Sequence, residues 1–355
     1  MEKAQIREIT KEYHDAGSKA TADIARIAAE EGFACFDLKQ DTQEESIMGK
    51  LLRQKGYIRD LRTIRKNIPQ GAIVLLQHPF HHRQISRDRT LKELKEKKNC
   101  RFICVVHDVE ELRGYRYNEY YAQEFKTMLE TADQLIVHNT KMKEWFQSTG
   151  VPEEKLISLE CFDYLIPEAV DPAEQKDDKE ESICVAGNLD PDKSGYILEL
   201  GKTKGIRIHL YGPNCPDTLK QRGQIRYHGS VPPDELPGRL EGRFGLVWDG
   251  YSAESCMGEA GNYLKYNHPH KLSLYLASGI PVIIWEQSAA AEFVREQGVG
   301  LITGSIKEAE EAVMKVSEAE YAQMRDRANK TGAKLRSGAY FRSALAEAIM
   351  RIRTE

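Results

Sequence analysis

The sequence predicts an α/β protein built from two doubly wound, Rossmann-like domains of similar size. Three observations lead to this prediction. The chain has 355 residues, more than one ordinary domain contains. Short, nearly all-apolar runs alternate with amphipathic stretches, which is the pattern of parallel sheets covered by helices on both faces. One highly charged, proline-containing segment interrupts the alternation near the middle, so two such sheets follow one another along the chain.

The first domain is expected to span residues 1–165. Its strand-like runs are GFACFDL, GAIVLLQHP, RFICVVHD, DQLIVHN and KLISLE. Amphipathic stretches at 20–31 and 118–131 lie between some of these runs and are expected to be helices. In doubly wound sheets ligands bind outside the carboxyl ends of the strands, so the residues that follow these runs are the candidates for function.

Residues 166–182, IPEAVDPAEQKDDKEES, are expected to form a linker or hinge, because they contain two prolines and a dense charge run without helical or strand periodicity. The alternation then resumes with SICVAGNL, IRIHLYGPN, QIRYHGS, FGLVWDG, GIPVIIW and GVGLI. These runs define a second domain over residues 183–335. We expect the last helix, in residues 336–355, to cross back to the first domain, and the two domains to share one interdomain cleft.

Composition restricts the class of function. Hydrophobic residues make up 41% and charged residues 30% of the chain, which is typical of globular proteins with sizeable cores. The formal net charge of −4 gives no reason to expect a nucleic-acid partner. No apolar run approaches the ~20 residues that a membrane-spanning helix needs, and the N-terminus has no signal-peptide core. The seven cysteines form no C-x-x-C pair, so we expect a reduced, cytoplasmic protein.

The turn after the first strand of the second domain carries phosphate-binding chemistry. In AGNLDPDKSGYI, Gly187 and Asn188 form the turn and Lys193 leads into a helix. Free amides at a helix N-terminus and a lysine both favour an anion, although a solvated turn lysine is the alternative. Neither a P-loop nor a dinucleotide fingerprint is present. The next strand ends at Tyr211, which either stacks on a base or sugar or belongs to the edge of the core.

A second cationic feature lies in the segment YLKYNHPHKLSLYLASGIPVIIW. Pro269 suits a helix start, which places His270 and Lys271 beside the free amides of the first turn. Cations there oppose the helix dipole by about 0.3–1 kcal/mol each, so we interpret both as ligands of an anion such as a diphosphate. Replacing Lys271 should then barely affect stability. Asn267 could cap the helix without any ligand.

These segments resemble a bacterial group of GT-B glycosyltransferases that includes adhesin-modifying glucosyltransferases and β-1,6-galactofuranosyltransferases of surface-polysaccharide clusters. In the second half the resemblance rests on AGNL…KS, FGLVWDG, GNYLKYNHPHKLSLYLASGIPVIIW and SAAAEFV. In the first half it rests on YHDAGSKATADI, VVHDVEELR and IVHNTKMKEWF. It spans nearly the whole chain, and the YNHPHK…YLASGIPVI block is its most specific part.

The resemblance implies a GT-B fold and metal-independent transfer of a hexosyl group, galactofuranose or glucose, from a UDP-sugar to a hydroxyl of a growing surface glycan or glycoprotein. The acceptor would bind the first domain and the donor the second. A lipid-linked acceptor would bring the chain to a membrane surface, and we expect a homo-oligomer. The donor-binding positions are Gly17, Lys193, Tyr211, Asn267, His270, Lys271 and Leu272, beside the turn of Gly187 and Asn188. The insertion DPD before Lys193 departs from the family's pattern.

Transfer to a hydroxyl requires a group that takes up its proton, unless a phosphate oxygen of the donor does so. The candidates are Asp15, next to His14, and the loop of His107 and Asp108, which we favour because a carboxylate can orient a histidine base. Adjacent strand residues point to opposite faces, so His107 could instead be a core histidine and Asp108 a turn cap. Arg113 is assigned to the acceptor side, with a surface ion pair as the alternative.

Two other functions stay open at this point. The chain could be an inactive nucleotide-sugar-binding or scaffold subunit, or a GT-B-like epimerase. The histidines and aspartates at strand ends of the first domain favour a transferase. The histidine-rich QHPFHH, with His78, His81 and His82, has no assigned role. No carboxylate or cysteine lies at ligand spacing, so we expect no metal site there.

Overall fold

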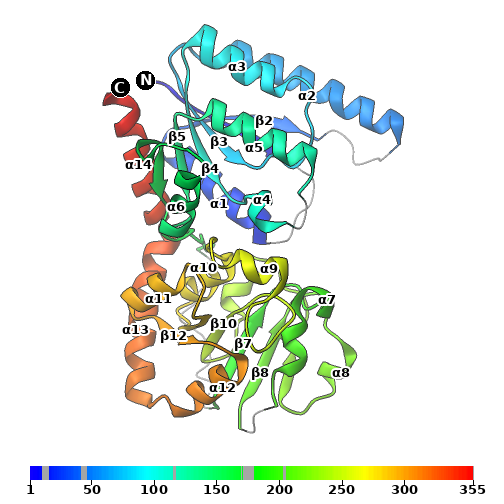
Figure 1. The fold of residues 1–355 in the computed structure, drawn as a ribbon, viewed down its shortest axis with the longest axis vertical. Coiled ribbons are helices and arrows are strands. Elements are labelled where there is room, and N and C mark those ends of the chain that lie inside the picture. The colour runs from blue at the N-terminus through cyan, green and yellow to red at the C-terminus, as the bar shows by residue number, and fades with distance from the viewer. Residues whose placement is uncertain are drawn as a thin grey trace.

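The structure, a computed structural model, describes residues 1–9, 16–40, 46–114, 117–168, 170, 180–202 and 205–354. Figure 1 shows two α/β domains, one above the other, each built on a parallel sheet of six strands. This architecture confirms the predicted fold class. Most of the predicted hinge, 166–182, lies outside the described residues.

The strand order of the first sheet is β2-β1-β3-β4-β5-β6, and every neighbouring pair is parallel. Its strands are β1 (Lys3–Ile9), β2 (Ala34–Lys39), β3 (Ile73–His78), β4 (Arg101–Val106), β5 (Gln134–Val137) and β6 (Leu156–Ser158). The order reverses between β1 and β3. Such a reversal is a topological switch point, where the crevice of a doubly wound sheet binds its ligand.

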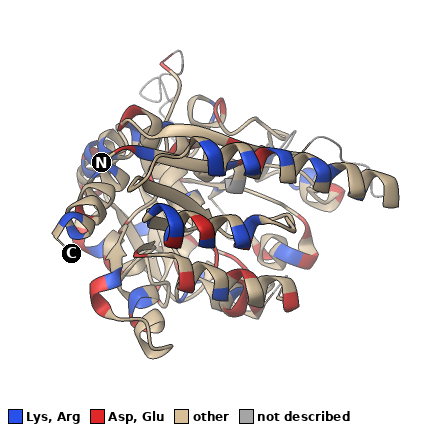
Figure 2. Cartoon of the chain, turned by 90° about the horizontal axis from the view of Figure 1, so that it is seen from above, with Lys and Arg blue, Asp and Glu red and all other residues tan. Residues whose placement is uncertain are grey.

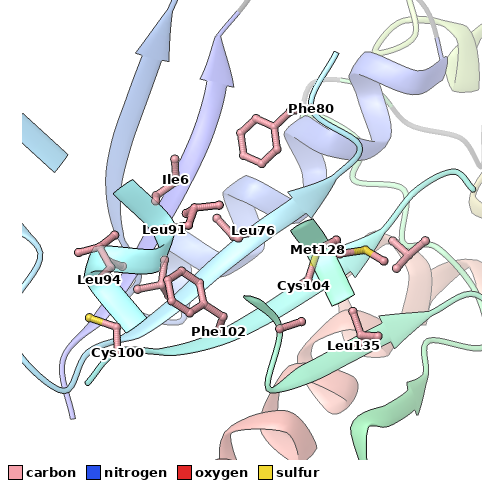
Figure 3. Close-up of a cluster of buried hydrophobic side chains, with 14 of the residues drawn as sticks. Ile6, Leu76, Phe80, Leu91, Leu94, Cys100, Phe102, Cys104, Met128 and Leu135 are labelled. Atoms are coloured by element: carbon pink, nitrogen blue, oxygen red, sulfur yellow. The ribbon is translucent and has the colours of Figure 1, made fainter. Parts of the chain in front are cut away.

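Helices cover both faces of this sheet because its central strands are apolar on both sides. Along β3, Val74 and Leu76 point to the side of α2 (Ile47–Asn67), α3 (Arg87–Lys98) and α5 (Glu119–Thr131), where they join the core drawn in Figure 3. Ile73 and Leu75 point to the opposite side, which α1 (Ala16–Glu30) and α14 (Ala339–Thr354) cover.

The last helix crosses back to the first domain, as predicted. Phe341 and Leu345 of α14 are buried against Ile24 and Ile27 of α1 and against the first sheet (Figure 1). Asp163 begins this contact, because its carboxylate accepts hydrogen bonds from the first-turn amides of α14, at 2.7 Å from that of Phe341. A carboxylate at a helix N-terminus is stabilising.

The second sheet has the order β12-β11-β10-β7-β8-β9 and is also entirely parallel. Its strands are β7 (Ser182–Ala186), β8 (Arg207–Tyr211), β9 (Ile225–Tyr227), β10 (Phe244–Val247), β11 (Val282–Trp285) and β12 (Gly300–Thr303). Its longer helices are α10 (His270–Ala277), α11 (Ala291–Gln297), α12 (Ile306–Lys315) and α13 (Glu318–Arg336). The switch point of this sheet lies between β7 and β10.

Two further expectations concern the cysteines and membrane-spanning helices. The cysteines are unpaired, and all but the exposed Cys35 are buried, as small hydrophobes would be. Within the described ranges, every helix is either too short or too polar to cross a bilayer.

Candidate functional site

The turn after β7 lies at the switch point of the second sheet. Gly187 has a φ of 147°, and a Cβ on the facing Gly212 would lie 1.8 Å from the carbonyl oxygen of Gly187. The two turns therefore pack backbone against backbone and require glycine. Asn188 is exposed and accepts a hydrogen bond from Asn214 at 2.9 Å, which fixes the turn. The predicted Gly187–Asn188 turn is thus rigid and lies beside the crevice.

Lys193 lies on α7 (Pro191–Ser194), a helix of only four residues that Asp190 caps. Its side chain is exposed and makes no ion pair among the described residues. The structure therefore places Lys193 near the turn of Gly187, and its contact with a phosphate stays a prediction.

Helix α10 is held firmly against the switch point. The ring of Tyr275 covers Gly245 of β10, where an added Cβ would lie 2.2 Å from the ring. The Tyr275 hydroxyl accepts a hydrogen bond of 2.7 Å from the amide of Ala186, the last residue of β7. One side chain thus fixes α10 to both strands that flank the crevice. Leu272, another predicted position, is fully buried in the same core, so only its backbone faces any ligand.

Lys271 begins this helix and points to the end of β10. Its ammonium group donates 2.8 Å hydrogen bonds to the carbonyl oxygen of Trp248 and to the carboxylate of Asp249. A lysine has three N–H donors, so these bonds leave one for an anion at the switch point. The same bonds correct the expectation that Lys271 can be replaced without loss of stability, because its removal would leave a carboxylate and a carbonyl without their donor.

The structure changes the predicted charge of His270 and removes the capping alternative for Asn267, whose donor-binding role stays a prediction. The helix begins after Pro269 without a side-chain cap, so Asn267 does not cap it. Burial, reinforced by the charge of Lys19, lowers the pKa of His270 to about 3, against a smaller opposing effect of the Asp163 backbone. His270 is therefore neutral near pH 7 and is not the second cation that the sequence suggested. Both of its ring nitrogens, and the side-chain oxygen of Asn267, are buried without a hydrogen-bond partner among the described residues.

On the first-domain side, His107 follows β4 and lies at the domain boundary. Its Nε2 atom is 2.7 Å from Oε1 of Gln77, and its ring stacks on Phe162 at 5.3 Å. Asp108 instead accepts a 2.8 Å hydrogen bond from Arg113. The predicted dyad of His107 and Asp108 is therefore not what orients the histidine; Gln77 has that position. Adjacent residues on an extended chain point apart, which is the physical reason.

Three histidines surround Phe162 where the two domains meet. His107 stacks on its ring, His138 after β5 contacts its edge at 4.9 Å, and His270 of the second domain lies 6.4 Å away. Burial, and then the nearby histidines, holds the pKa of His107 well below its usual range, while burial lowers the pKa of His138 to about 4. All three rings are thus neutral proton acceptors near pH 7. His138 also accepts a 2.9 Å hydrogen bond from the His268 amide, which ties the domains together here.

The unassigned histidines of QHPFHH lie at the end of β3, where His78 is the last strand residue and His81 and His82 follow it, beside the switch point of the first sheet. There the carboxylate of Glu8, on β1, accepts hydrogen bonds from the amides of His81 and His82 at 2.8 and 3.2 Å, and from Gln84 at 2.9 Å. Burial raises the pKa of Glu8 to about 7, although these donors favour the carboxylate. Within the described ranges, the histidines His78, His81 and His82 belong to no cluster of metal-ligand size.

Glu8 and Lys19 are two residues that sequence reasoning missed. Lys19, on α1, is buried beside Asp23 at 2.5 Å, and it also reaches Asp234 of the second domain at 3.1 Å. A buried lysine near the start of α1 places a cation at the domain boundary, opposite His270. The position of Glu8 at the end of a strand is a sequence signal for a functional acid. Lys19 has no such signal, because its hydrogen-bond partner Leu165 is 146 residues away in the sequence and Asp234 is farther still.

The remaining predicted positions are settled only in part. His14 and Asp15 lie outside the described residues, and Gly17 lies in the first turn of α1. Tyr211 is buried; its hydroxyl donates to the carbonyl of Arg239 and accepts from the Glu241 amide, and its ring stacks on His228 at 4.4 Å. These contacts fit the core-edge alternative, and stacking on a nucleotide stays a prediction.

Comparison with known proteins identifies the family. The N-terminal domain of the Glucosyltransferase 3-like family matches residues 3–161, and its C-terminal domain matches residues 183–348. A β-1,6-galactofuranosyltransferase of Escherichia coli, WbbI, is 35% identical over 261 residues, 72% of this chain and 73% of the relative. Glucosyltransferase 3 of Streptococcus gordonii is 24% identical over 339 residues, covering 94% of each chain.

Solved structures agree on the fold. The apo lipopolysaccharide outer core galactosyltransferase WaaB superposes with a TM-score of 0.61 at 13% identity, over 99% of each chain. Anabaena Alr3699/HepE in complex with UDP-glucose superposes with a TM-score of 0.59 at 11% identity, over 99% of each chain. Together with the family matches over both halves, these findings show that the chain belongs to the Glucosyltransferase 3-like family of glycosyltransferases with the GT-B fold.

Proposed function

We propose that the chain transfers a hexosyl group, galactofuranose or glucose, from a UDP-sugar to a hydroxyl of a surface glycan or glycoprotein. In this proposal the second domain holds the UDP-sugar and the first domain the acceptor. The observation that carries it is the position of Lys271, which is fixed by Trp248 and Asp249 at the switch point of the second sheet. A fixed cation with one remaining donor suits a diphosphate.

The donor class follows from the relatives and from local chemistry. The named relatives are galactofuranosyl- and glucosyltransferases, and a neighbour of the same fold binds UDP-glucose. Lys271, Lys193 and the backbone of the Gly187 turn supply the positive and hydrogen-bonding groups that a metal ion would otherwise provide, so we propose metal-independent transfer. An inactive binding subunit is not favoured, because the named relatives are transferases.

A surface on α2 supports a membrane-associated, lipid-linked acceptor. This helix contains seven cations and one acid, although the whole chain has a net charge of −4. Its N-terminal end exposes Ile47, Met48, Leu51 and Leu52, and Figure 2 shows basic residues along its length. Apolar side chains flanked by cations suit a surface of anionic lipids. We propose that α2 brings the acceptor side to such a surface; a cytoplasmic location and a homo-oligomer remain expectations.

A thermal-shift panel tests the donor class. UDP, GDP, ADP, CMP and TDP are compared with and without magnesium and with a chelator. UDP at 100 times its dissociation constant should stabilise the fold by about 2.7 kcal/mol, and the chelator should leave that shift intact. Stabilisation by GDP or ADP instead, or loss of the UDP shift with chelator, would overturn the assignment. Product analysis with UDP-sugar and no acceptor separates transfer from epimerisation.

A further inference from the structure

Three side chains in the second domain form a compact group away from Lys271. They are His209 on β8, His228 just after β9, and Glu241 in the loop that leads to β10. Nδ1 of His209 lies 3.0 Å from Nε2 of His228 and 3.7 Å from a carboxylate oxygen of Glu241. One ligand-type atom of each residue lies within 4.8 Å of the others.

These distances match the requirements of a zinc ion. Zinc binds histidine nitrogen at about 2.0–2.1 Å and carboxylate oxygen at about 2.0–2.2 Å in tetrahedral geometry, which separates the ligand atoms by roughly 3.3–3.5 Å. The two separations of His209 lie on either side of this value, and the separation between His228 and Glu241 is at most 4.8 Å. The Glu241 side chain is partly exposed, so its rotation toward His228 would bring all three atoms onto one ion. A His-His-Glu set leaves the fourth position for water or another ligand.

The surrounding contacts hold the ligands in place. His209 is fully buried in the sheet, and the ring of His228 is stacked between those of His209 and Tyr211, at 5.2 and 4.4 Å. The Glu241 amide donates a 2.8 Å hydrogen bond to the Tyr211 hydroxyl, which fixes the loop that carries the carboxylate. Ligands oriented by their neighbours bind metal more tightly than free side chains do, because less order must be gained on binding.

We propose that His209, His228 and Glu241 bind a divalent transition metal, for which zinc is the probe, and that the ion joins β8, the segment after β9 and the loop before β10. The ion would hold these three segments together, with water or another ligand in its fourth position, and would take no part in the transfer. The two glycine turns of the crevice are continuous with this region, because Gly212 follows Tyr211 directly and its amide donates to the carbonyl of Gly229. Bound metal would therefore stabilise the edge of the sheet that supports the Gly187 turn. This proposal is independent of the metal-free transfer proposed above, in which no cation contacts the diphosphate.

The alternative is a plain hydrogen bond between two neutral histidines, and metal analysis of the full chain distinguishes the two. The protein is treated with chelator, incubated with zinc, dialysed, and its metal content measured; cobalt then replaces zinc and its visible absorption reports tetrahedral coordination. We expect one zinc per chain, a tetrahedral cobalt spectrum and a higher melting temperature with zinc than with chelator. His228→Ala and Glu241→Gln should lose the bound metal and the zinc-dependent rise in melting temperature.

The exposed thiol of Cys35 is the competing ligand for zinc, so Cys35→Ser is the matched control and should keep full metal content. If His228→Ala fails to fold, Glu241→Gln supplies the test, since its amide keeps the shape of the carboxylate. Wild-type protein without stoichiometric metal, or an unchanged content in a folded ligand variant, would overturn the site. UDP binding is measured separately by the nucleotide panel, whose chelator arm is repeated on folded Glu241→Gln, so that metal lost from this site is not mistaken for metal needed by the donor.

Discussion

The carboxyl ends of the two sheets contain different chemistry. In the second domain they carry glycine turns and Lys271, whose charge is balanced by the carboxylate of Asp249. In the first domain they carry histidines and acids whose pKa values are shifted so that the neutral form is favoured. The pKa of His138 is lowered to about 4, and that of Glu8 is raised to about 7. One side thus offers a fixed charge and the other offers neutral groups that can take up or release a proton.

Sugar transfer needs both kinds of chemistry. A leaving nucleoside diphosphate requires positive charge and amides that are already in place, whereas the acceptor hydroxyl requires a proton acceptor. Under the proposed function, electrostatic stabilisation would come from the second domain and proton transfer from the first. Replacing one residue on each side should therefore separate turnover from donor binding.

The largest effect is expected from His107→Ala. If His107 is the base, this variant should lose ~100–10,000-fold in turnover and bind UDP nearly as tightly as wild type, because it lies on the other side of the boundary from Lys271. The pKa of His107 lies well below its usual range, so its loss of activity on acidification should begin below pH 6.5. Steady-state turnover across pH and UDP titration measure the two quantities.

Asp108→Asn is the matched control, because Asp108 accepts a hydrogen bond from Arg113, whereas Gln77 is the partner of Nε2 of His107. It should reduce turnover less than His107→Ala does. If His107→Ala keeps turnover within a few-fold of wild type, His107 is not the base. Asp15→Asn then tests the other candidate, and a small effect there too would favour proton transfer to a phosphate oxygen of the donor.

A smaller effect, on donor binding rather than on the chemical step, is expected from the two lysines. Lys271→Ala should weaken UDP binding by roughly 1.5–3 kcal/mol, or about 10- to 150-fold. It should also lower the free energy of unfolding by about 1–3 kcal/mol, because Trp248 and Asp249 lose their donor. Lys193→Ala, in an exposed side chain, should weaken UDP binding without that loss of stability. Calorimetric titration and denaturant unfolding measure both; unchanged UDP affinity in folded Lys271→Ala would make this lysine structural only.

The sequence predicted the alternation of strands and helices well, because apolar runs such as those of β4 and β11 are buried on both faces. Hydropathy alone did not identify β1, whose sequence KAQIREI is half polar, and only the His14 and Asp15 that follow it indicated a strand end there. Gln5 in this strand is buried, but its side-chain amide donates to the carbonyl of Ala25, a contact that no local pattern reveals. Local hydropathy therefore identified the apolar strands and not the polar one at the switch point.

Residue type and place in the chain were enough to predict that Lys271 and the Gly187 turn lie at the switch point of the second sheet, and their contact with a donor stays a prediction. The charges of the surrounding groups were not predictable in this way. The predicted positive charge of His270 was wrong. Its pKa depends on burial against the first domain and on the charge of Lys19, which is 251 positions away in the sequence. The partner of His107 is Gln77, from the neighbouring strand, and only the register of β3 and β4 brings them together.

The smallest effect expected is a change in how stability depends on pH when Glu8 is replaced. The pKa of Glu8 is raised from 4.5 to about 7 in the folded chain, so between these values the folded state holds a proton that the unfolded state has lost. Stability from this group is present below pH 4.5 and is lost as the pH rises through 7, with a slope of at most about 1.4 kcal/mol per pH unit for one proton. Glu8→Gln cannot titrate, so the difference in unfolding free energy between wild type and Glu8→Gln should fall by pH 7 and then level off. Denaturant unfolding at pH 4.5, 6, 7 and 8 measures this difference, and Glu254→Gln, in an exposed glutamate of the second domain, provides the control. If the difference in unfolding free energy does not change with pH, Glu8 ionises normally in the folded chain. Glu8 would then not be one of the neutral proton-transfer groups that distinguish the first domain from the second.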